Sequence, residues 1–150
     1  MVNEILHYPI VFFSGLDRTG KTTTRKKFAE FTGQKYITFD RSFIDNIVYD
    51  KMFRGKEVTD AGFRVLMRRW KRLGKVCIVH LTLELDEINR RAVATGEEAY
   101  PLFELDDANV LFKKYFKAAE AYDIKIIRVK ADGKTVDEIV NEIVSNIGGL

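Results

Sequence analysis

The eight residues from Gly15 to Thr22, G-L-D-R-T-G-K-T, constrain this chain more than any other segment. They satisfy the pattern G-x-x-x-x-G-K-[S/T], in which backbone N–H groups turn inward and the next helix adds the positive end of its dipole. The pattern requires a strand before the loop and a helix after it. Ile10–Phe13 is an apolar strand candidate, and a helix is expected from Lys21 to about Phe31. The sequence therefore predicts a loop that holds the triphosphate of a nucleotide.

Each fixed position of this loop has its own physical task. Gly15 and Gly20 permit backbone conformations that a side chain would obstruct. Lys21 places a point charge on the outer phosphates, and Thr22 offers a hydroxyl to a magnesium ion. ATP and Mg²⁺ are therefore the expected cofactors. The residues predicted to contact the nucleotide in this segment are Gly15, Leu16, Asp17, Arg18, Thr19, Gly20, Lys21, Thr22 and Thr23.

Predicted strands and helices alternate along the rest of the chain. The expected strands are 10–13, 36–39, 76–85 and 125–129. The expected helices are 21–31, 42–53, one capped by Thr59, 86–95, 105–121 and one opened by a capping box at 135–138. Strands separated by helices favour a mostly parallel sheet that is covered on both faces, with ligands beyond the carboxyl ends of its strands. We expect one domain over residues 1–150, a three-layer P-loop α/β sandwich with about four strands.

Composition narrows the function classes only slightly. The 25 basic and 22 acidic residues leave a net charge of +3, too small to indicate nucleic acid but compatible with a phosphate site. The single cysteine, Cys77, cannot form an intramolecular disulfide, which fits a reducing cytoplasmic setting. No apolar stretch approaches the roughly 20 residues that span a bilayer, so no membrane partner is expected.

The segment from Val11 to Thr23, VFFSGLDRTGKTT, resembles the phosphate loop of thymidylate kinases. Those enzymes share a superfamily with deoxyribonucleoside kinases, and their loop reads E-G-[LV]-D-x-x-G-K-[ST]-T after an apolar strand. Ser14 stands here in place of the usual glutamate. Three further segments resemble the family: Asp40-Arg41-Ser42; Leu83-Glu84-Leu85-Asp86 with Arg90-Arg91 and Gly96-Glu97-Glu98; and Lys130-Ala131-Asp132-Gly133 with Val136 and Ile139.

The resemblance implies a catalytic set of Lys21, Arg18, Asp40 and Arg41. One class of thymidylate kinases has an arginine at the position of Arg18, which would stabilise charge on the transferred phosphoryl group. Asp40 would lie near Mg²⁺ and the attacking oxygen, so Thr22 and Asp40 form the expected metal site. Arg41 would bind the acceptor phosphate or the transition state. The alternatives are a solvated loop residue at Arg18, and a local ion pair or helix cap at Asp40 and Arg41.

The resemblance also implies contacts with the acceptor and with the adenine. Asp17 matches a carboxylate that reaches the acceptor's sugar hydroxyl, with an ordinary turn residue as the alternative. Arg41, Asp45 and Tyr49 are spaced by four and share one helix face, so all three join Asp17 as expected substrate contacts. A lid is expected over residues 87–104, in which Arg91 either reaches a phosphate or faces solvent. Asp132 lies in the segment that would back the adenine.

One part of the family pattern is missing. Only 15 residues, Arg25 to Phe39, separate the loop's threonines from Asp40, which is room for one helix and one strand. Full-size thymidylate kinases have a further strand, helices and an acceptor-binding loop at this point. The identity of the acceptor therefore stays open. Candidates to rebuild part of its pocket are Phe43, Phe53, Arg54 and Tyr100, with a core or surface position as the alternative for each.

The leading hypothesis is ATP-dependent phosphorylation of a deoxynucleoside monophosphate, with a deoxynucleoside as the other small-molecule acceptor. A 5′-hydroxyl polynucleotide kinase is an alternative, and the basic cluster at 64–72 is its support. A non-catalytic ATP-binding module is the third possibility. A GTP switch is disfavoured because the sequence has no N-K-x-D motif. The resemblance makes a homodimer possible.

Overall fold

The computed structural model describes residues 9–148, which contain one four-stranded sheet. The strand order is β2-β1-β3-β4, and every neighbouring pair is parallel. The strands are β1 Ile10–Ser14, β2 Ile37–Asp40, β3 Val76–Thr82 and β4 Lys125–Lys130. The expected short parallel sheet is confirmed, and all of its strands end at the same edge.

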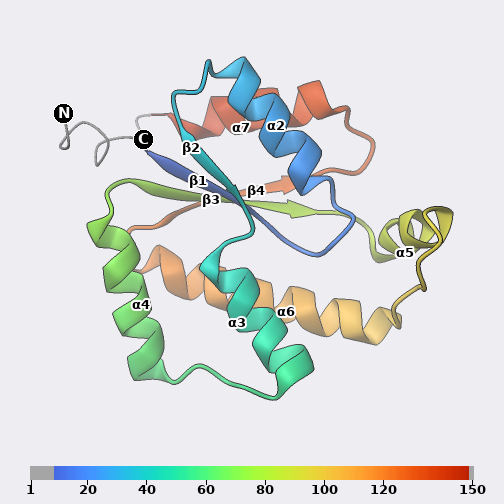
Figure 1. Cartoon of the computed structure of the whole chain (residues 1–150), viewed down its shortest axis with the longest axis horizontal. Helices are drawn as coiled ribbons and strands as arrows, with labels where there is room; N and C mark the ends of the chain where they lie inside the picture. The colour runs from blue at the N-terminus through green and yellow to red at the C-terminus, as the bar shows by residue number, and fades with distance from the viewer. Residues whose placement is uncertain (1–8, 149–150) are drawn as a thin grey trace.

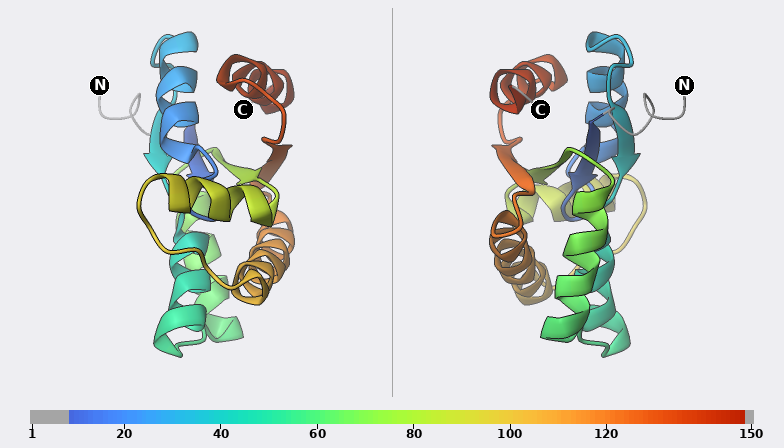
Figure 2. Two further views of the ribbon diagram at one scale, coloured as in Figure 1. Left: turned by 90° about the vertical axis from the view of Figure 1, so that its right-hand side faces the viewer. Right: turned by 90° about the vertical axis from the view of Figure 1, so that its left-hand side faces the viewer.

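The helices form the two outer layers of a sandwich (Figure 1). They are α2 Lys21–Phe31, α3 Phe43–Arg54, α4 Asp60–Arg72, α5 Leu85–Ala94, α6 Leu102–Glu120 and α7 Val136–Ile147. Helices α2 and α7 cover one face of the sheet, while α3, α4 and α6 cover the other. Figure 2 looks along the sheet, and its left view shows α5 in front of the edge at which the strands end. This edge is where a ligand is expected in a parallel sheet.

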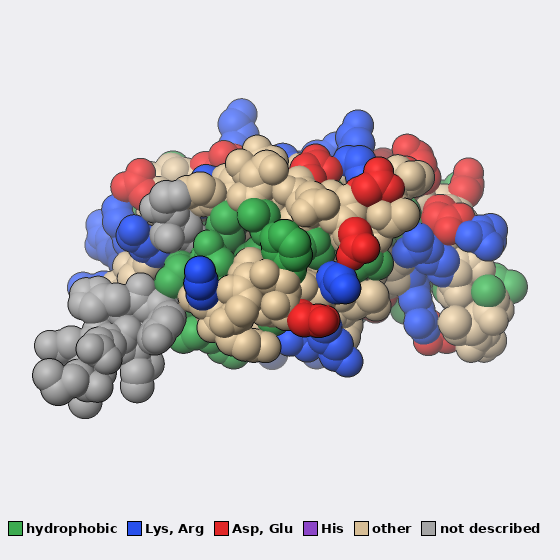
Figure 3. Space-filling view, turned by 90° about the horizontal axis from the view of Figure 1, so that it is seen from above, with side chains coloured by type: hydrophobic (Ala, Val, Ile, Leu, Met, Phe, Trp, Pro, Cys, Tyr) green, Lys and Arg blue, Asp and Glu red, His purple; other side chains and the backbone are tan. Residues whose placement is uncertain are grey.

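The two central strands are apolar on both faces because both faces are covered. Val11, Phe13, Cys77 and Ile78 are fully buried, so the apolar runs of β1 and β3 face helices on each side. Figure 3 shows the α2 and α7 face, where hydrophobic side chains gather toward the middle among charged ones. No helix within residues 9–148 combines the length and hydrophobicity that crossing a membrane requires.

Some boundaries differ from the sequence-based expectation. The strand expected to run to Leu85 ends at Thr82, because the chain turns and the N–H of Glu84 donates to Oδ1 of Asp132 at 3.0 Å. Helix α6 begins three residues earlier than expected, directly after Pro101. Pro101 stands at its N-cap position and has no N–H to satisfy there. The expected caps at Thr59 and Thr135 are confirmed, the latter as a capping box.

Candidate functional site

The loop between β1 and α2 depends on glycine at two positions for different reasons. Gly15 has φ +134° and Gly20 has φ +87°, both in the region that side chains disfavour. At Gly15 there is also no room, because a Cβ would lie 2.4 Å from the carbonyl oxygen of Leu81 in β3. At Gly20 the nearest atom to such a Cβ is 4.0 Å away. Close packing against β3 thus fixes the start of the loop, and backbone conformation alone fixes its end.

Lys21 lies across the loop with its ammonium group largely withdrawn from solvent. Its Nζ donates to the carbonyl oxygens of Gly15 at 2.7 Å and Leu16 at 2.9 Å, and lies 3.8 Å from Oδ1 of Asp17. Burial lowers the pKa of Lys21, while the carboxylates of Asp45 and Asp17 act in the opposite direction. Burial disfavours the charged ammonium group, and an anion bound in the loop would stabilise it.

The side chains of two residues expected to contact the nucleotide help to shape the loop. Thr19 is buried, and its hydroxyl donates to the carbonyl oxygen of Leu16 at 2.9 Å. The side chain of Leu16 is also buried and lines a neighbouring apolar pocket. The phosphate cleft itself has a volume of about 390 Å³. Its lining residues are Asp17, Arg18, Gly20, Lys21, Thr22, Thr23, Asp40, Arg41 and Glu97.

Charge is balanced among the residues that line this phosphate cleft. Three carboxylates, Asp17, Asp40 and Glu97, face three cations, and the cleft contains ion pairs between Arg18 and Glu97 and between Arg41 and Asp17 at 3.4 Å. Lys21 is the third cation. Because these cations already have acidic partners, a bound polyphosphate would compete with carboxylates for them.

Both arginines expected to act in catalysis have strained backbones. Arg18 has φ 67° and Arg41 has φ 69°, conformations that cost energy for residues other than glycine. Such strain persists where the surrounding structure enforces it, and it clusters at functional sites. Here the N–H of Arg41 donates to the carbonyl oxygen of Phe13 at 2.8 Å, which holds Arg41 at the end of β2 beside the loop.

Thr22 and Asp40 lie together, as the expected metal site requires. The hydroxyl of Thr22 donates to Oδ2 of Asp40 at 3.2 Å, and Nε of Arg25 donates to Oδ1 at 2.9 Å. A hydroxyl and a carboxylate are ligands that fit Mg²⁺, which commonly keeps waters and phosphate oxygens for the rest of its shell. The described residues hold no group of three or more His, Cys, Asp or Glu side chains placed for a metal ion. Thr22 and Asp40 thus fit as two protein ligands of a magnesium ion.

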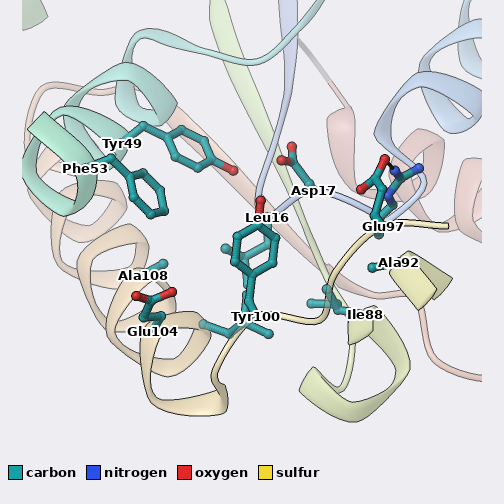
Figure 4. Close-up of a pocket in the computed structure, with 12 residues that line it drawn as sticks. Leu16, Asp17, Tyr49, Phe53, Ile88, Ala92, Glu97, Tyr100, Glu104 and Ala108 are labelled. Carbon is teal, nitrogen blue, oxygen red and sulfur yellow. Dashed lines mark ion pairs between the residues drawn. The ribbon is translucent and has the colours of Figure 1, made fainter. Parts of the chain in front are cut away.

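An apolar pocket lined by aromatic side chains adjoins the phosphate cleft (Figure 4). It shares Asp17, Arg18 and Glu97 with the cleft. Its other members come from the loop, α3, α5, α6 and the connection at 95–101, which we name the lid connection. They are Leu16, Tyr49, Phe53, Ile88, Ala92, Tyr100, Glu104, Leu105 and Ala108. We name this the aromatic pocket, and its free volume of about 40 Å³ leaves room for only a few water molecules.

Helix α5 braces both the lid connection and the phosphate loop. The side-chain amide of Asn89 donates to the carbonyl oxygen of Tyr100 at 2.8 Å and accepts from its N–H at 2.9 Å. Nη1 of Arg91 donates to the carbonyl oxygen of Arg18 at 3.0 Å. Arg91 also lines a further cleft that contains Asp132, beside Glu84 and Glu87. The two residues expected near the nucleotide outside the loop therefore share one cleft.

The geometry of Asp45 does not fit the expected contact with substrate. Its side chain is fully buried. Its carboxylate accepts from the hydroxyl of Ser14 at 2.5 Å, the N–H of Ser42 at 2.7 Å and the N–H of Gly15 at 3.3 Å. Asp45 forms a capping box with Ser42 at the start of α3 and fastens that helix behind the loop. The spacing S-x-x-D after β2 is the sequence signal that could have indicated this role.

Tyr49 lies nearer the surface of the same helix and does line the aromatic pocket. The guanidinium of Arg41 lies 5.6 Å from the centre of its ring, a cation–π contact that links the two expected substrate residues. Burial is the main cause that raises the pKa of the Tyr49 phenol, so it remains a hydrogen-bond donor at neutral pH. Glu104 lines the same pocket, and no motif in the sequence singled it out.

No protein-family model matches the sequence, and neither does any curated protein. Among solved structures, the crystal structure of the YorR protein from Bacillus subtilis, in complex with phosphorylated GDP, matches this chain with a TM-score of 0.70. The two chains are 18% identical, and the match covers 92% of this chain and 95% of YorR. At this identity the likeness establishes the fold. The chain therefore has a three-layer α/β sandwich fold with a short parallel sheet, as the sequence predicted.

Proposed function

We propose that this protein transfers the γ-phosphoryl group of MgATP to a nucleoside monophosphate, with a deoxynucleoside monophosphate as the acceptor. The observation that carries the proposal is the junction of the phosphate cleft and the aromatic pocket at Asp17, Arg18 and Glu97. A triphosphate in the loop would present its outer phosphate at this junction, next to an acceptor in the pocket. The phosphorylated GDP in the YorR crystal supports a nucleotide as ligand.

The residues of the cleft suit phosphoryl transfer, which depends mainly on positioning and charge stabilisation. Lys21 and the loop N–H groups would bind the donor phosphates. Arg18 and Arg41 would leave Glu97 and Asp17 to pair with phosphate oxygens, for which their planar forks are well shaped. Thr22 and Asp40 would hold a magnesium ion, which neutralises phosphate charge when it is bound.

A monophosphate fits the site better than a nucleoside. A nucleoside hydroxyl benefits from a base that removes its proton, but Asp40, the carboxylate expected near the attacking oxygen, pairs with Arg25 at 2.9 Å and would also hold the magnesium ion. A phosphate monoester has a second pKa of about 6, so its oxygens are largely ionised at neutral pH and need no base. The engagement of Asp40 therefore favours the monophosphate.

A polynucleotide acceptor has less support. The basic cluster at 64–72 belongs to α4, which leads directly into the start of β3. The phosphate loop follows the other end of the parallel strand β1, so the two features lie toward opposite edges of the sheet (Figure 1). A strand bound along α4 would not deliver its 5′ end to the cleft.

The test is ADP release from MgATP with a panel of deoxynucleoside monophosphates, deoxynucleosides and a 5′-hydroxyl oligonucleotide. We expect turnover with at least one monophosphate and background rates with the rest of the panel. Turnover with only a deoxynucleoside would indicate a nucleoside kinase, and turnover with only the oligonucleotide would indicate a polynucleotide kinase. Tight ATP binding without any acceptor-dependent ADP release would leave only the non-catalytic module.

A further inference from the structure

One carboxylate in the aromatic pocket has no partner. Glu104 lies half-buried in the first turn of α6, and within residues 9–148 its carboxylate makes no hydrogen bond or ion pair. The other charged side chains of the pocket are paired, Arg18 with Glu97 and Asp17 with Arg41. Figure 4 places Glu104 near Phe53 and Ala108, across the pocket from Asp17. A ligand that donates hydrogen bonds would stabilise this unpaired carboxylate in its largely apolar pocket.

Resting on the proposed function, we propose that Glu104 reads the base of the acceptor nucleotide and selects guanine. A carboxylate can accept two parallel hydrogen bonds. Guanine offers two adjacent donors, N1–H and the N2 amino group, on its Watson–Crick edge. Thymine offers one N–H flanked by two carbonyl oxygens, which would face the carboxylate oxygens and repel them. Adenine and cytosine each offer one amino donor beside a ring nitrogen that accepts.

The walls of the pocket suit a flat ring but do not choose between bases. Tyr49, Phe53 and Tyr100 contribute aromatic side chains, and stacking on aromatic rings tolerates every base. The ring of Tyr100 stands in the middle of the pocket in Figure 4, which explains why little free volume remains. A base would enter when the lid connection moves this ring aside, and discrimination then falls to Glu104.

The two ends of the pocket set the direction of the acceptor. Arg18 and Asp17 mark the end that opens into the phosphate cleft, and Asp17 is paired there with Arg41. Glu104 marks the other end. A monophosphate bound with its phosphate near the two arginines would direct its base toward Glu104, whereas the reverse direction would bring phosphate and carboxylate together. Charge alone therefore selects one orientation.

The experiment compares kcat/KM for dGMP, dIMP, dAMP, dCMP and dTMP between the wild type and Glu104→Gln. We expect the wild type to prefer dGMP, with dIMP, which lacks the N2 amino group, used less well. The substitution should lower the dGMP-to-dTMP ratio by about 5- to 150-fold, the range that one bidentate base contact gives, mainly through the acceptor KM. Asp107→Asn, an exposed position on the same helix outside the pocket, is the matched control and should leave the ratio unchanged.

The outcomes separate this inference from the proposed function. Turnover that favours another base, or a ratio unaltered by Glu104→Gln, would overturn the role of Glu104 while the kinase assignment stands. If no monophosphate is phosphorylated although ATP binds, the kinase assignment falls, and calorimetric titration with dGMP and dTMP decides the role of Glu104. Tighter binding of dGMP that the substitution removes would support it, and equal or absent binding of both nucleotides would overturn it.

Discussion

The phosphate loop and the aromatic pocket adjoin and share three residues, yet they are built in different ways. The loop is one continuous segment. Contacts within residues 15–22 and with β3 shape it, and Asp45 of α3 and Arg91 of α5 add one hydrogen bond each to its backbone. The pocket takes side chains from the loop, α3, α5, the lid connection and α6. A site made from one segment carries its signature in residue spacing. A site assembled from five segments depends on how the helices pack together, and residue spacing in the sequence does not reveal that packing.

Removing the positive charge of Lys21 is expected to have the largest effect on phosphoryl transfer. Lys21→Ala should lower phosphoryl transfer roughly 10³-fold, because no other group can place a compact positive charge over the phosphates from that position. ADP release with the best acceptor of the panel measures it. Lys26→Ala is the matched control, since Lys26 is an exposed lysine on the same helix, and it should keep normal turnover. Near-normal turnover of Lys21→Ala would contradict the role of the loop.

The second prediction separates the two glycines of the loop. Gly15→Ala should lower the free energy of unfolding by about 4 kcal/mol, because its Cβ meets the Leu81 carbonyl oxygen in addition to the backbone strain. Gly20→Ala should cost only about 1 kcal/mol, since strain acts there without a clash. Urea unfolding of both variants gives the comparison. Equal losses would mean that contact with β3 does not fix the loop.

The same contrast explains how much the sequence could predict. The loop, the parallel sheet and the caps at Thr59 and Thr135 follow from local patterns, and the structure contains them. Asp45 was expected to contact substrate because helical spacing placed it on one face with Arg41 and Tyr49. Spacing by four does not say that the hydroxyl of Ser14, from another element, would draw its carboxylate into the interior. Burial of a charge is decided by such tertiary partners.

The pocket residues outside the loop also show that sequence patterns do not reveal which side chains packing brings together. Glu104 sits in the first turn of α6, where an acidic residue is already explained by the helix dipole, so its sequence context gives no hint of a ligand. Its place opposite Asp17 arises only when α6 packs beside α3 and α5. Phe53 and Tyr100 were weak candidates from sequence for the same reason. The structure places both in one pocket, and their role toward an acceptor stays a prediction.

The third prediction concerns His80, a buried residue of the central strand β3. His80 of β3 is in register with Ser14, and its ring packs against Phe112 and Phe116 of α6. Among residues 9–148, its buried Nε2 finds no hydrogen-bond partner. Burial, with smaller effects from Arg128, Lys113 and Lys21, lowers the pKa of His80 from 6.5 to about 4. The folded protein therefore favours the neutral ring, whereas the unfolded chain takes up a proton as the pH falls below 6.5.

The stability that neutral His80 contributes is complete above pH 6.5 and is lost as the pH falls toward 4. The full difference corresponds to about 3 kcal/mol in the free energy of unfolding. His80→Leu, similar in size and unable to titrate, should lose about 3 kcal/mol less than the wild type between pH 7 and pH 4. Unfolding at several pH values measures this, and NMR titration of the wild-type ring checks the pKa directly. Parallel pH profiles for the two proteins would refute the prediction.

The smallest effect is expected where the pocket alone is disturbed. Asn89→Ala removes both hydrogen bonds to the backbone of Tyr100 at an exposed site, so the stability cost should be about 1 kcal/mol or less. The acceptor KM should rise about 5-fold, because the lid connection must be ordered again when it closes over a base. Asn141→Ala, an exposed asparagine on α7, is the control and should change neither value.

Affinity for ATP decides how this last result is interpreted. Helix α5 also supports the phosphate loop through Arg91 and the Arg18 carbonyl oxygen, a contact that Asn89→Ala leaves in place. Unchanged ATP affinity with a raised acceptor KM would show that the pocket can be loosened while the loop keeps its shape. An equal loss for both ligands would mean that α5 couples the two regions, and that the loop is less self-contained than its continuous sequence suggests.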